Sequence, residues 1–146
     1  MRILTKSFED LSLTELYQLL QLRSEVFVVE QKCAYQDVDG MDQEALHVMG
    51  FEGDEMLAYT RVFPPGVYDD YARIGRVVVG KNQRSKGLGV DIMKATMEAV
   101  KAKYNTSKMS LSAQTYLVKF YRDMGFHETG NEYLEDGIPH ILMLKD

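Results

Sequence analysis

Seven short stretches of this chain either alternate apolar and polar residues or run continuously apolar, and both patterns are typical of β-strands. The stretches are residues 3–8, 46–52, 56–63, 74–79, 109–113, 126–134 and 138–144. The stretch 74–79 lacks polar alternation, which indicates a strand buried on both faces. Gly53-Asp54 and Asp136-Gly137 predict tight turns that join two pairs of these strands into hairpins.

Three further segments carry apolar residues at helical spacing. The first follows Ser12, which is placed to form a capping box with Glu15, and extends to about residue 29. The second begins after Gly87, and the third ends at Gly125, which suits a left-handed helix cap. The resulting order, β-α-β-β-β-α-β-α-β-β, predicts an α/β or α+β fold in which helices flank a mixed central sheet.

The composition fits one domain over residues 1–146 and argues against several other classes of protein. Apolar residues make up 45% of the chain, and a net charge of −5 disfavours general binding of nucleic acid. No apolar run is long enough to cross a membrane and no signal peptide is evident, so we expect a cytoplasmic protein. Cys33, the single cysteine, favours a reducing compartment. We expect no metal site, since three scattered histidines and one cysteine lack ligand spacing.

The most informative segment is residues 76–90, where an apolar run ends at Gly80, a basic loop follows and a helix begins after Gly87. A strand, a loop and a helix N-terminus in this order present unpaired backbone N–H groups that can bind a diphosphate. The segment lacks the Gly-Lys-Ser/Thr of a Walker loop. It also lacks the third glycine of a dinucleotide fingerprint, because Ile92 stands there. It does contain Arg-x-x-Gly-x-Gly, at residues 84–89.

This pattern resembles the acyl-CoA loop of the GCN5-related N-acetyltransferases, the GNAT superfamily, and other segments extend the resemblance. Residues 119–126, Lys-Phe-Tyr-Arg-Asp-Met-Gly-Phe, are similar to the Phe-Tyr-x-x-x-Gly-Phe segment of that family. Residues 22–31, 35–40 and 135–140 are similar to its ElaA-like branch in particular. The predicted order of elements also matches the family's fold over nearly the whole chain.

The resemblance implies transfer of an acetyl group from acetyl-CoA to a primary amine by direct attack on the thioester. It implies that the strand at 77–79 pairs with the pantetheine arm and that the Val78 amide donates to the thioester oxygen. The residues assigned to the coenzyme are Val77, Val78, Val79, Arg84, Ser85, Lys86, Gly87, Leu88, Gly89 and Gln114. The alternative for the loop is an ordinary strand–loop–helix connection with solvated basic residues.

Two side chains are assigned to proton transfer. Tyr121 matches the family's general acid toward the departing sulfur, and a phenol with a pKa of about 10 is protonated at neutral pH. The alternative is that Tyr121 only packs on the apolar stripe of its helix. His140 follows a turn and Pro139 near the start of the last strand, and imidazole is suited to accept a proton near neutral pH. The alternative is a structural histidine.

The acceptor amine is not determined by the sequence. The residues assigned to it are Arg23, Phe27, His47 and Arg76. Arginines favour an anionic acceptor, whereas the acidic residues of the segment 30–44 form either a solvated loop or a negative rim that attracts a cationic amine. The expected partner is a small-molecule or protein amine, with neither nucleic acid nor membrane, and a homodimer through the last two strands stays open. The rival function is an acyl-CoA-binding sensor module with little catalysis.

Overall fold

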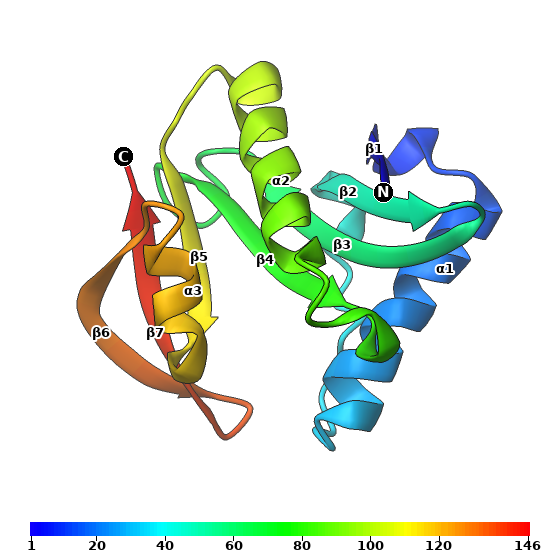
Figure 1. The fold of residues 1–146 in the computed structure, drawn as a ribbon. Coiled ribbons are helices and arrows are strands. Elements are labelled where there is room, and N and C mark those ends of the chain that lie inside the picture. The colour runs from blue at the N-terminus through cyan, green and yellow to red at the C-terminus, as the bar shows by residue number, and fades with distance from the viewer.

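A seven-stranded sheet forms the centre of the structure, a computed structural model that describes all residues 1–146 (Figure 1). Its strands are β1 (Arg2–Ser7), β2 (Leu46–Glu52), β3 (Glu55–Phe63), β4 (Ala72–Val79), β5 (Met109–Gln114), β6 (His127–Glu135) and β7 (Ile138–Lys145). They lie in the order β1-β2-β3-β4-β5-β7-β6, and all neighbours are antiparallel except β4 and β5. The predicted mixed sheet and order of elements are confirmed.

Three α-helices flank the sheet: α1 (Leu13–Arg23), α2 (Leu88–Tyr104) and α3 (Val118–Arg122). The predicted capping box is present, because the Ser12 side chain accepts from the Glu15 amide and the Glu15 carboxylate accepts from the Ser12 amide. After α1 the chain continues as a π-helical segment, Ser24–Glu30. The first helical region thus reaches the predicted end, but its C-terminal part is wound more widely than an α-helix. Short 3-10 turns cover Phe8–Asp10, Asp42–Glu44, Lys81–Gln83 and Thr115–Leu117.

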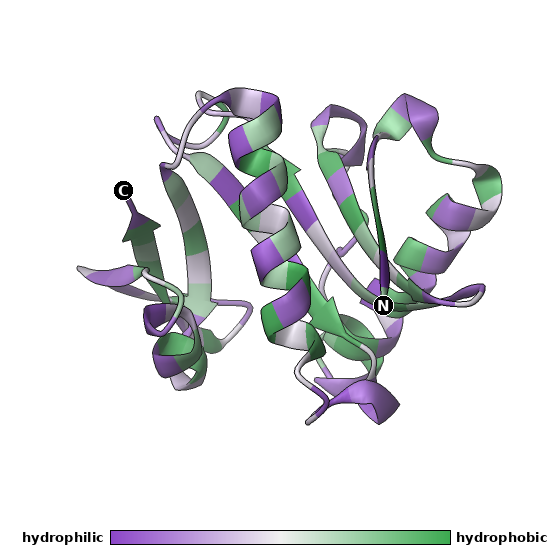
Figure 2. Ribbon diagram, turned by 45° about the horizontal axis from the view of Figure 1, so that its top comes forward, coloured by the Kyte–Doolittle hydropathy of each residue, from purple (hydrophilic) through white to green (hydrophobic).

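Two hydrophobic clusters lie on opposite faces of the sheet, because successive residues of a strand point to opposite sides. On β3, Ala58 packs in the cluster under α2, and the next residue, Tyr59, packs in the cluster under α1. Hydrophobic and hydrophilic residues interleave along α2 in Figure 2, as expected for a helix with one buried face. None of the helices has both the length and the apolar composition that crossing a bilayer requires.

The divergence of β4 from β5 creates the space for a site (Figure 1). The two strands pair only over three residues of each, Ala72, Arg73 and Ile74 with Met109, Ser110 and Leu111. Beyond Ile74, β4 has no neighbour on that side, whereas β5 continues to pair with β7 as far as Gln114. The backbone groups on the open edge of β4 therefore lack strand partners, although the strand is paired with β3 on its other side.

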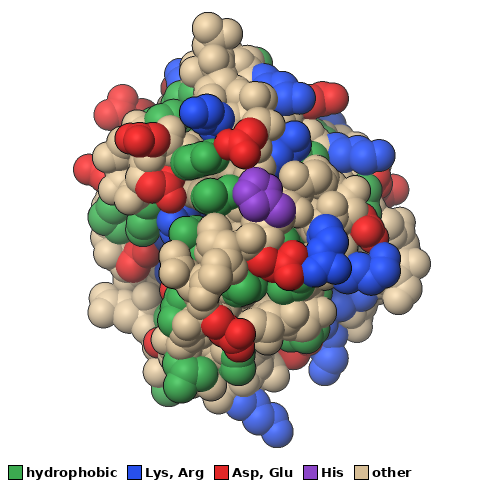
Figure 3. Space-filling view, turned by 90° about the vertical axis from the view of Figure 1, so that its left-hand side faces the viewer, with side chains coloured by type: hydrophobic (Ala, Val, Ile, Leu, Met, Phe, Trp, Pro, Cys, Tyr) green, Lys and Arg blue, Asp and Glu red, His purple; other side chains and the backbone are tan.

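Strand β6 forms one edge of the sheet, and Figure 3 shows the side of the molecule that it occupies. Leu134 is exposed on this strand, but Glu132 and Glu135 stand close to it in the sequence. The pairing with β7 is interrupted by a bulge between Glu128 and Glu132. Charges and bulges hinder edge-to-edge association of sheets. In Figure 3 basic and acidic side chains are interspersed over this face, without a large patch of one sign.

Candidate functional site

A cavity of about 860 Å³ fills the gap between β4 and β5. Its walls come from the open edge of β4, the N-terminus of α2, the π-helical segment, the end of β5, α3 and the β6–β7 turn. All the residues assigned to the coenzyme line it except Lys86, whose ammonium donates to the side-chain oxygen of Gln83 at 3.1 Å in the exposed part of the loop. The segment 84–89 and the edge of β4 thus face one continuous space.

The loop before α2 leaves several backbone amides free. Ser85 and Gly87 both adopt positive φ, +67° and +77°, and α2 starts directly afterwards. Its first backbone bond runs from the Asp91 amide to the Gly87 carbonyl, so the amides of residues 88–90 have no partner within the helix. These amides lie at the positive end of the helix dipole and beside the cavity, where they can bind an anion.

Gly89 has a packing role besides. A Cβ atom at this position would lie 3.3 Å from the Phe120 ring. Because Gly89 has no Cβ atom, the first turn of α2 can approach α3. The Arg-x-x-Gly-x-Gly loop at 84–89 and the Phe-Tyr segment at 119–126 are far apart in the sequence, and they meet at the cavity wall.

The hydrogen-bond phase of β4 decides which amides face the cavity. The Gly80 amide donates to the Leu57 carbonyl of the β3 side at 2.9 Å. Donors alternate between the two edges of a strand, and Val78 is opposite Tyr59, so the Val78 amide also points toward β3. The amides of Val77 and Val79 are left on the open edge. This corrects the expectation that Val78 supplies the donor.

Tyr121 lies on the cavity wall and is also packed, so the two interpretations of this residue are compatible. Only 6% of its surface is exposed, and its ring meets Phe120 and Phe126 edge-to-face with centroids 5.0 and 6.2 Å apart. Burial raises the pKa of the phenol above its ordinary value, which keeps the hydroxyl protonated at neutral pH. A fixed, protonated phenol in this position can donate to a ligand atom.

His140 also lies on the cavity wall, on β7 next to the end of β5. It pairs with Gln114 in the β5–β7 register, and its ring stacks on Tyr133. Nδ1 lies 2.7 Å from the Ile138 carbonyl, which can only accept, so Nδ1 carries the hydrogen in the neutral ring. Nε2 is then the acceptor, and it lies 3.3 Å from a carboxylate oxygen of Glu135. His140 and Glu135 thus stand together on the cavity wall.

The four residues expected at the acceptor side are divided by the structure. Phe27, from the π-helical segment, and Arg76, from β4, line the cavity. Arg23 and His47 do not line it, because both are fully buried on the α1 side of the sheet. The His47 Nε2–H group donates to the Asp42 carbonyl at 2.9 Å, and Nδ1 accepts from the Tyr59 hydroxyl at 2.6 Å. Burial lowers the pKa of His47, which therefore is a neutral structural residue.

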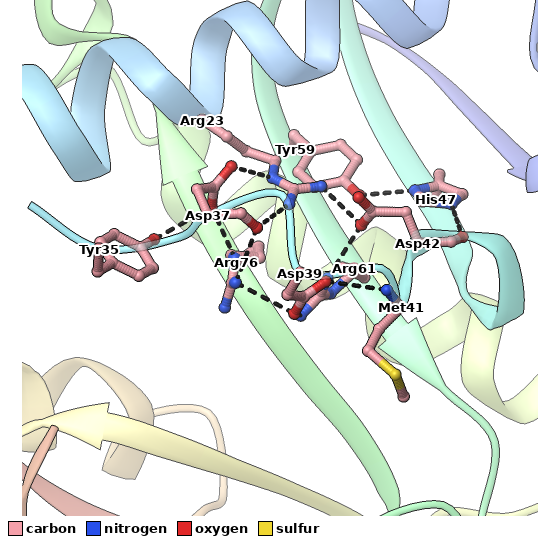
Figure 4. A network of polar contacts seen from close by, with 10 residues as sticks. All are labelled: Arg23, Tyr35, Asp37, Asp39, Met41, Asp42, His47, Tyr59, Arg61 and Arg76. Atoms are coloured by element: carbon pink, nitrogen blue, oxygen red, sulfur yellow. Dashed lines mark hydrogen bonds and ion pairs between the residues drawn. The ribbon is translucent and has the colours of Figure 1, made fainter. Parts of the chain in front are cut away.

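Three arginines and three aspartates form a closed network beside the cavity (Figure 4). The pairs are Arg23 with Asp37 and Asp42, Arg61 with Asp39 and Asp42, and Arg76 with Asp37 and Asp39, all at N···O distances of 2.7 to 3.3 Å. Asp37, Asp39 and Asp42 are therefore neither a solvated loop nor a negative rim. The opposite charges that suggested two kinds of acceptor neutralise one another.

This network predicts a loss of stability in acid. Burial alone would raise the pKa of Asp39, but bonds from Arg61 and the Met41 amide, with nearby arginine charge, lower it to about 2. A carboxyl whose folded pKa lies below its unfolded value of about 4 stabilises the fold above pH 4, and this contribution is lost as the pH falls from about 4 toward 2. The urea concentration at the midpoint of unfolding should fall with pH across this range, and Asp39→Asn should flatten the decline.

Glu44→Gln is the exposed control and should leave the decline intact. If the decline in Asp39→Asn is as steep as in the native protein, the assignment to Asp39 is refuted.

The outer end of the cavity is bridged by an ion pair. The Arg84 guanidinium binds both oxygens of Glu30 from the π-helical segment, with one N···O distance of 2.8 Å, and it also lies 3.3 Å from the Val79 carbonyl. Hydrogen bonding to Arg84 lowers the pKa of Glu30, so the carboxylate is charged. The loop that holds the free amides is thereby tied to the far wall.

Several residues that line the cavity were not predicted from the sequence. Ser112 had a usable signal, because it stands two residues before Gln114 and so shares its face of β5. Gln83 and Tyr116 lie in short 3-10 turns and had no pattern to mark them. No group of three or more His, Cys, Asp or Glu side chains is arranged to hold a metal ion.

Comparison with known proteins gives one consistent result. The family model described as an acetyltransferase (GNAT) domain matches residues 9–146. Protein ElaA of Escherichia coli K12 is 40% identical over 139 residues, which cover 94% of this chain and 91% of ElaA. The crystal structure of Escherichia coli ElaA matches this fold with a TM-score of 0.92 over 99% of each chain, at 38% identity. An acyl-CoA N-acyltransferase from Pseudomonas aeruginosa matches with a TM-score of 0.93 over the whole of both chains, at 41% identity.

Proposed function

Because this chain belongs to the GNAT acetyltransferase family, whose members use an acyl-CoA as cosubstrate, we propose that it transfers an acetyl group from acetyl-CoA to a primary amine. One observation carries the proposal. A single cavity brings together free amides at the N-terminus of α2, an unpaired edge of β4, a protonated Tyr121 and an oriented His140. These are the groups that amine acetylation from a thioester needs.

The binding roles follow from the direction of the amides. The amides of residues 88–90 hold the diphosphate, assisted by the charge of Arg84. The pantetheine arm lies along the open edge of β4, where it pairs with the Val79 amide as an added strand would. The Val77 amide then donates to the thioester oxygen and stabilises the negative charge that develops there during attack.

The proton transfers use the two side chains on the cavity walls. Nε2 of His140 accepts a proton from the attacking amine as its nitrogen bonds to the carbonyl carbon, and Glu135 stabilises the imidazolium. The tetrahedral intermediate then collapses and the carbon–sulfur bond breaks. The Tyr121 hydroxyl donates its proton to the leaving sulfur, so that the products are the acetamide and the free thiol, and solvent returns the proton to the phenolate.

The direct test is a titration with acetyl-CoA followed by measurement of thiol release in the presence of single amines. The panel contains amino acids, polyamines, lysine peptides and an anionic amine. We expect saturable binding and release that depends on one class of amine. Binding without release from any amine would favour a sensor module instead, and the absence of binding would overturn the role of residues 84–89.

The ion pair at the cavity mouth yields a further prediction. Glu30→Gln is expected to tighten coenzyme binding by up to about fivefold, since the diphosphate no longer competes with Glu30 for Arg84 and an exposed pair contributes at most about 1 kcal/mol. Arg84→Ala is expected to weaken binding. Calorimetric titration measures both, with Glu44→Gln as the exposed control. Weaker binding by Glu30→Gln would mean that the ion pair preorganises the loop.

A further inference from the structure

Strand β4 contains an irregularity directly before the amide assigned to the thioester oxygen. Tyr59 is opposite Val78, but Arg61 is opposite Gly75, so Arg76 and Val77 together face the single residue Thr60. This is a β-bulge, in which the extra residue changes the direction of the strand and of the groups that follow. The bulge thus determines where the Val77 amide points.

The bulge has an unusual residue at its first position. Arg76 adopts φ +49°, and among the five non-glycine residues with positive φ it is the only one inside a strand or an α-helix. Glycine is the residue that takes this conformation without steric cost. The conformational energy that a non-glycine residue costs at this φ has to be offset by contacts of its side chain.

The side chain of Arg76 supplies those interactions (Figure 4). Nε donates to the Asp37 carboxylate at 2.8 Å, and Nη2 donates to the Asp37 carbonyl at 3.1 Å and to the Asp39 carboxylate at 3.3 Å. The guanidinium also lies over the Tyr35 ring, 5.6 Å from its centroid. Two of the three nitrogens of this guanidinium therefore bind the segment 35–39, and only Nη1 is left to bind an acceptor amine.

The partner of Arg76 is itself fixed. Asp37 is buried, its second carboxylate oxygen accepts from Arg23 at 2.9 Å, and the Tyr35 hydroxyl lies 3.1 Å from the oxygen that binds Arg76. A chain of charged hydrogen bonds thus connects α1, through the segment 35–39, to the bulge, and each of these bonds has a defined direction.

We propose that Arg76 is a positioning residue, whose contacts with Asp37 and Asp39 hold the bulge that aims the Val77 amide at the thioester oxygen. The proposal rests on the proposed function, because only acyl transfer gives that amide a task. It replaces the expectation that Arg76 binds the acceptor.

The test compares Arg76→Ala with Arg76→Gly. Both variants lack the guanidinium, but glycine accepts the positive φ freely and alanine does not. We expect Arg76→Ala to lower kcat on the order of 10-fold to 100-fold with little change in the KM for the amine, and Arg76→Gly to recover most of that loss. Equal increases in amine KM in both variants would overturn the proposal, because that result identifies an acceptor-binding residue.

A replacement variant and an NMR measurement complete the kinetic comparison. If Arg76→Ala does not fold, Arg76→Lys replaces it: positioning predicts that glycine exceeds lysine in kcat, whereas recognition of the acceptor by charge predicts the reverse. The amide resonance of Val77 is followed by NMR while acetyl-CoA is added. It should shift in the native protein and in Arg76→Gly, and much less in Arg76→Ala or Arg76→Lys. Equal shifts of the Val77 resonance in all variants would refute the positioning role of Arg76. Absence of thiol release by the native protein would refute the proposed function. The two failures are therefore distinguishable, because the NMR titration does not depend on turnover.

Discussion

Tyr121→Phe is expected to lower kcat by roughly 100-fold while coenzyme affinity stays within about twofold of the native value. The ring remains between Phe120 and Phe126, so packing is kept and only the proton donor is lost. The raised pKa of Tyr121 adds a second expectation: deprotonation of this phenol should not reduce the rate until the pH exceeds the ordinary tyrosine value of about 10.

The matched control for this variant is Tyr116→Phe. Tyr116 lines the same cavity but is 74% exposed and lies outside the aromatic cluster. Thiol release and acetyl-CoA binding should be nearly unchanged in it. If Tyr121→Phe turns over as fast as the control, the departing sulfur takes its proton from another source and Tyr121 is a packing residue.

Asp42→Ala is expected to reduce the free energy of unfolding by about 3–5 kcal/mol. Its carboxylate accepts from Arg23 at 2.7 Å and from Arg61 at 2.9 Å, and all three side chains are buried. Removal leaves two buried guanidinium groups short of a counter-charge, which costs more than a solvated pair would. Urea unfolding monitored by circular dichroism measures the change.

Glu44→Ala provides the comparison, since Glu44 is exposed in the same short 3-10 turn and pairs with no arginine. A change below about 0.5 kcal/mol is expected there. A loss of less than about 1 kcal/mol in Asp42→Ala would show that the remaining aspartates compensate, and that the network is not a principal source of stability.

Local signals in the sequence predicted most of the fold. The Ser12 capping box, the Asp136-Gly137 turn and the cap at Gly125, with φ +98°, each depend on residues within a few positions of one another. The loop at residues 84–89 could be proposed from the sequence for the same reason, because one continuous segment of chain supplies it.

Long-range geometry was not predictable in this way. Arg23 and Arg61 were visible as charges, but nothing in the spacing shows that they bind aspartates 14 to 22 residues away rather than a ligand. The bulge at Arg76 breaks the local rule that assigns positive φ to glycine, since contacts from another segment stabilise it. The choice between Val77 and Val78 required the phase of the β3–β4 ladder.

The short pairing of β4 with β5 also has a mechanical consequence. Only three residue pairs join the four strands on one side of the seam to the three on the other, so few backbone hydrogen bonds connect the two halves of the sheet, which are held together by one hydrophobic cluster that includes residues of both. Amide hydrogens beside the seam should therefore exchange faster in the free protein than those of strands that are paired along their whole length. In the complex that we propose, the pantetheine arm pairs with the edge of β4 that has no strand partner in the free protein, so binding of the cosubstrate should slow amide exchange at the seam.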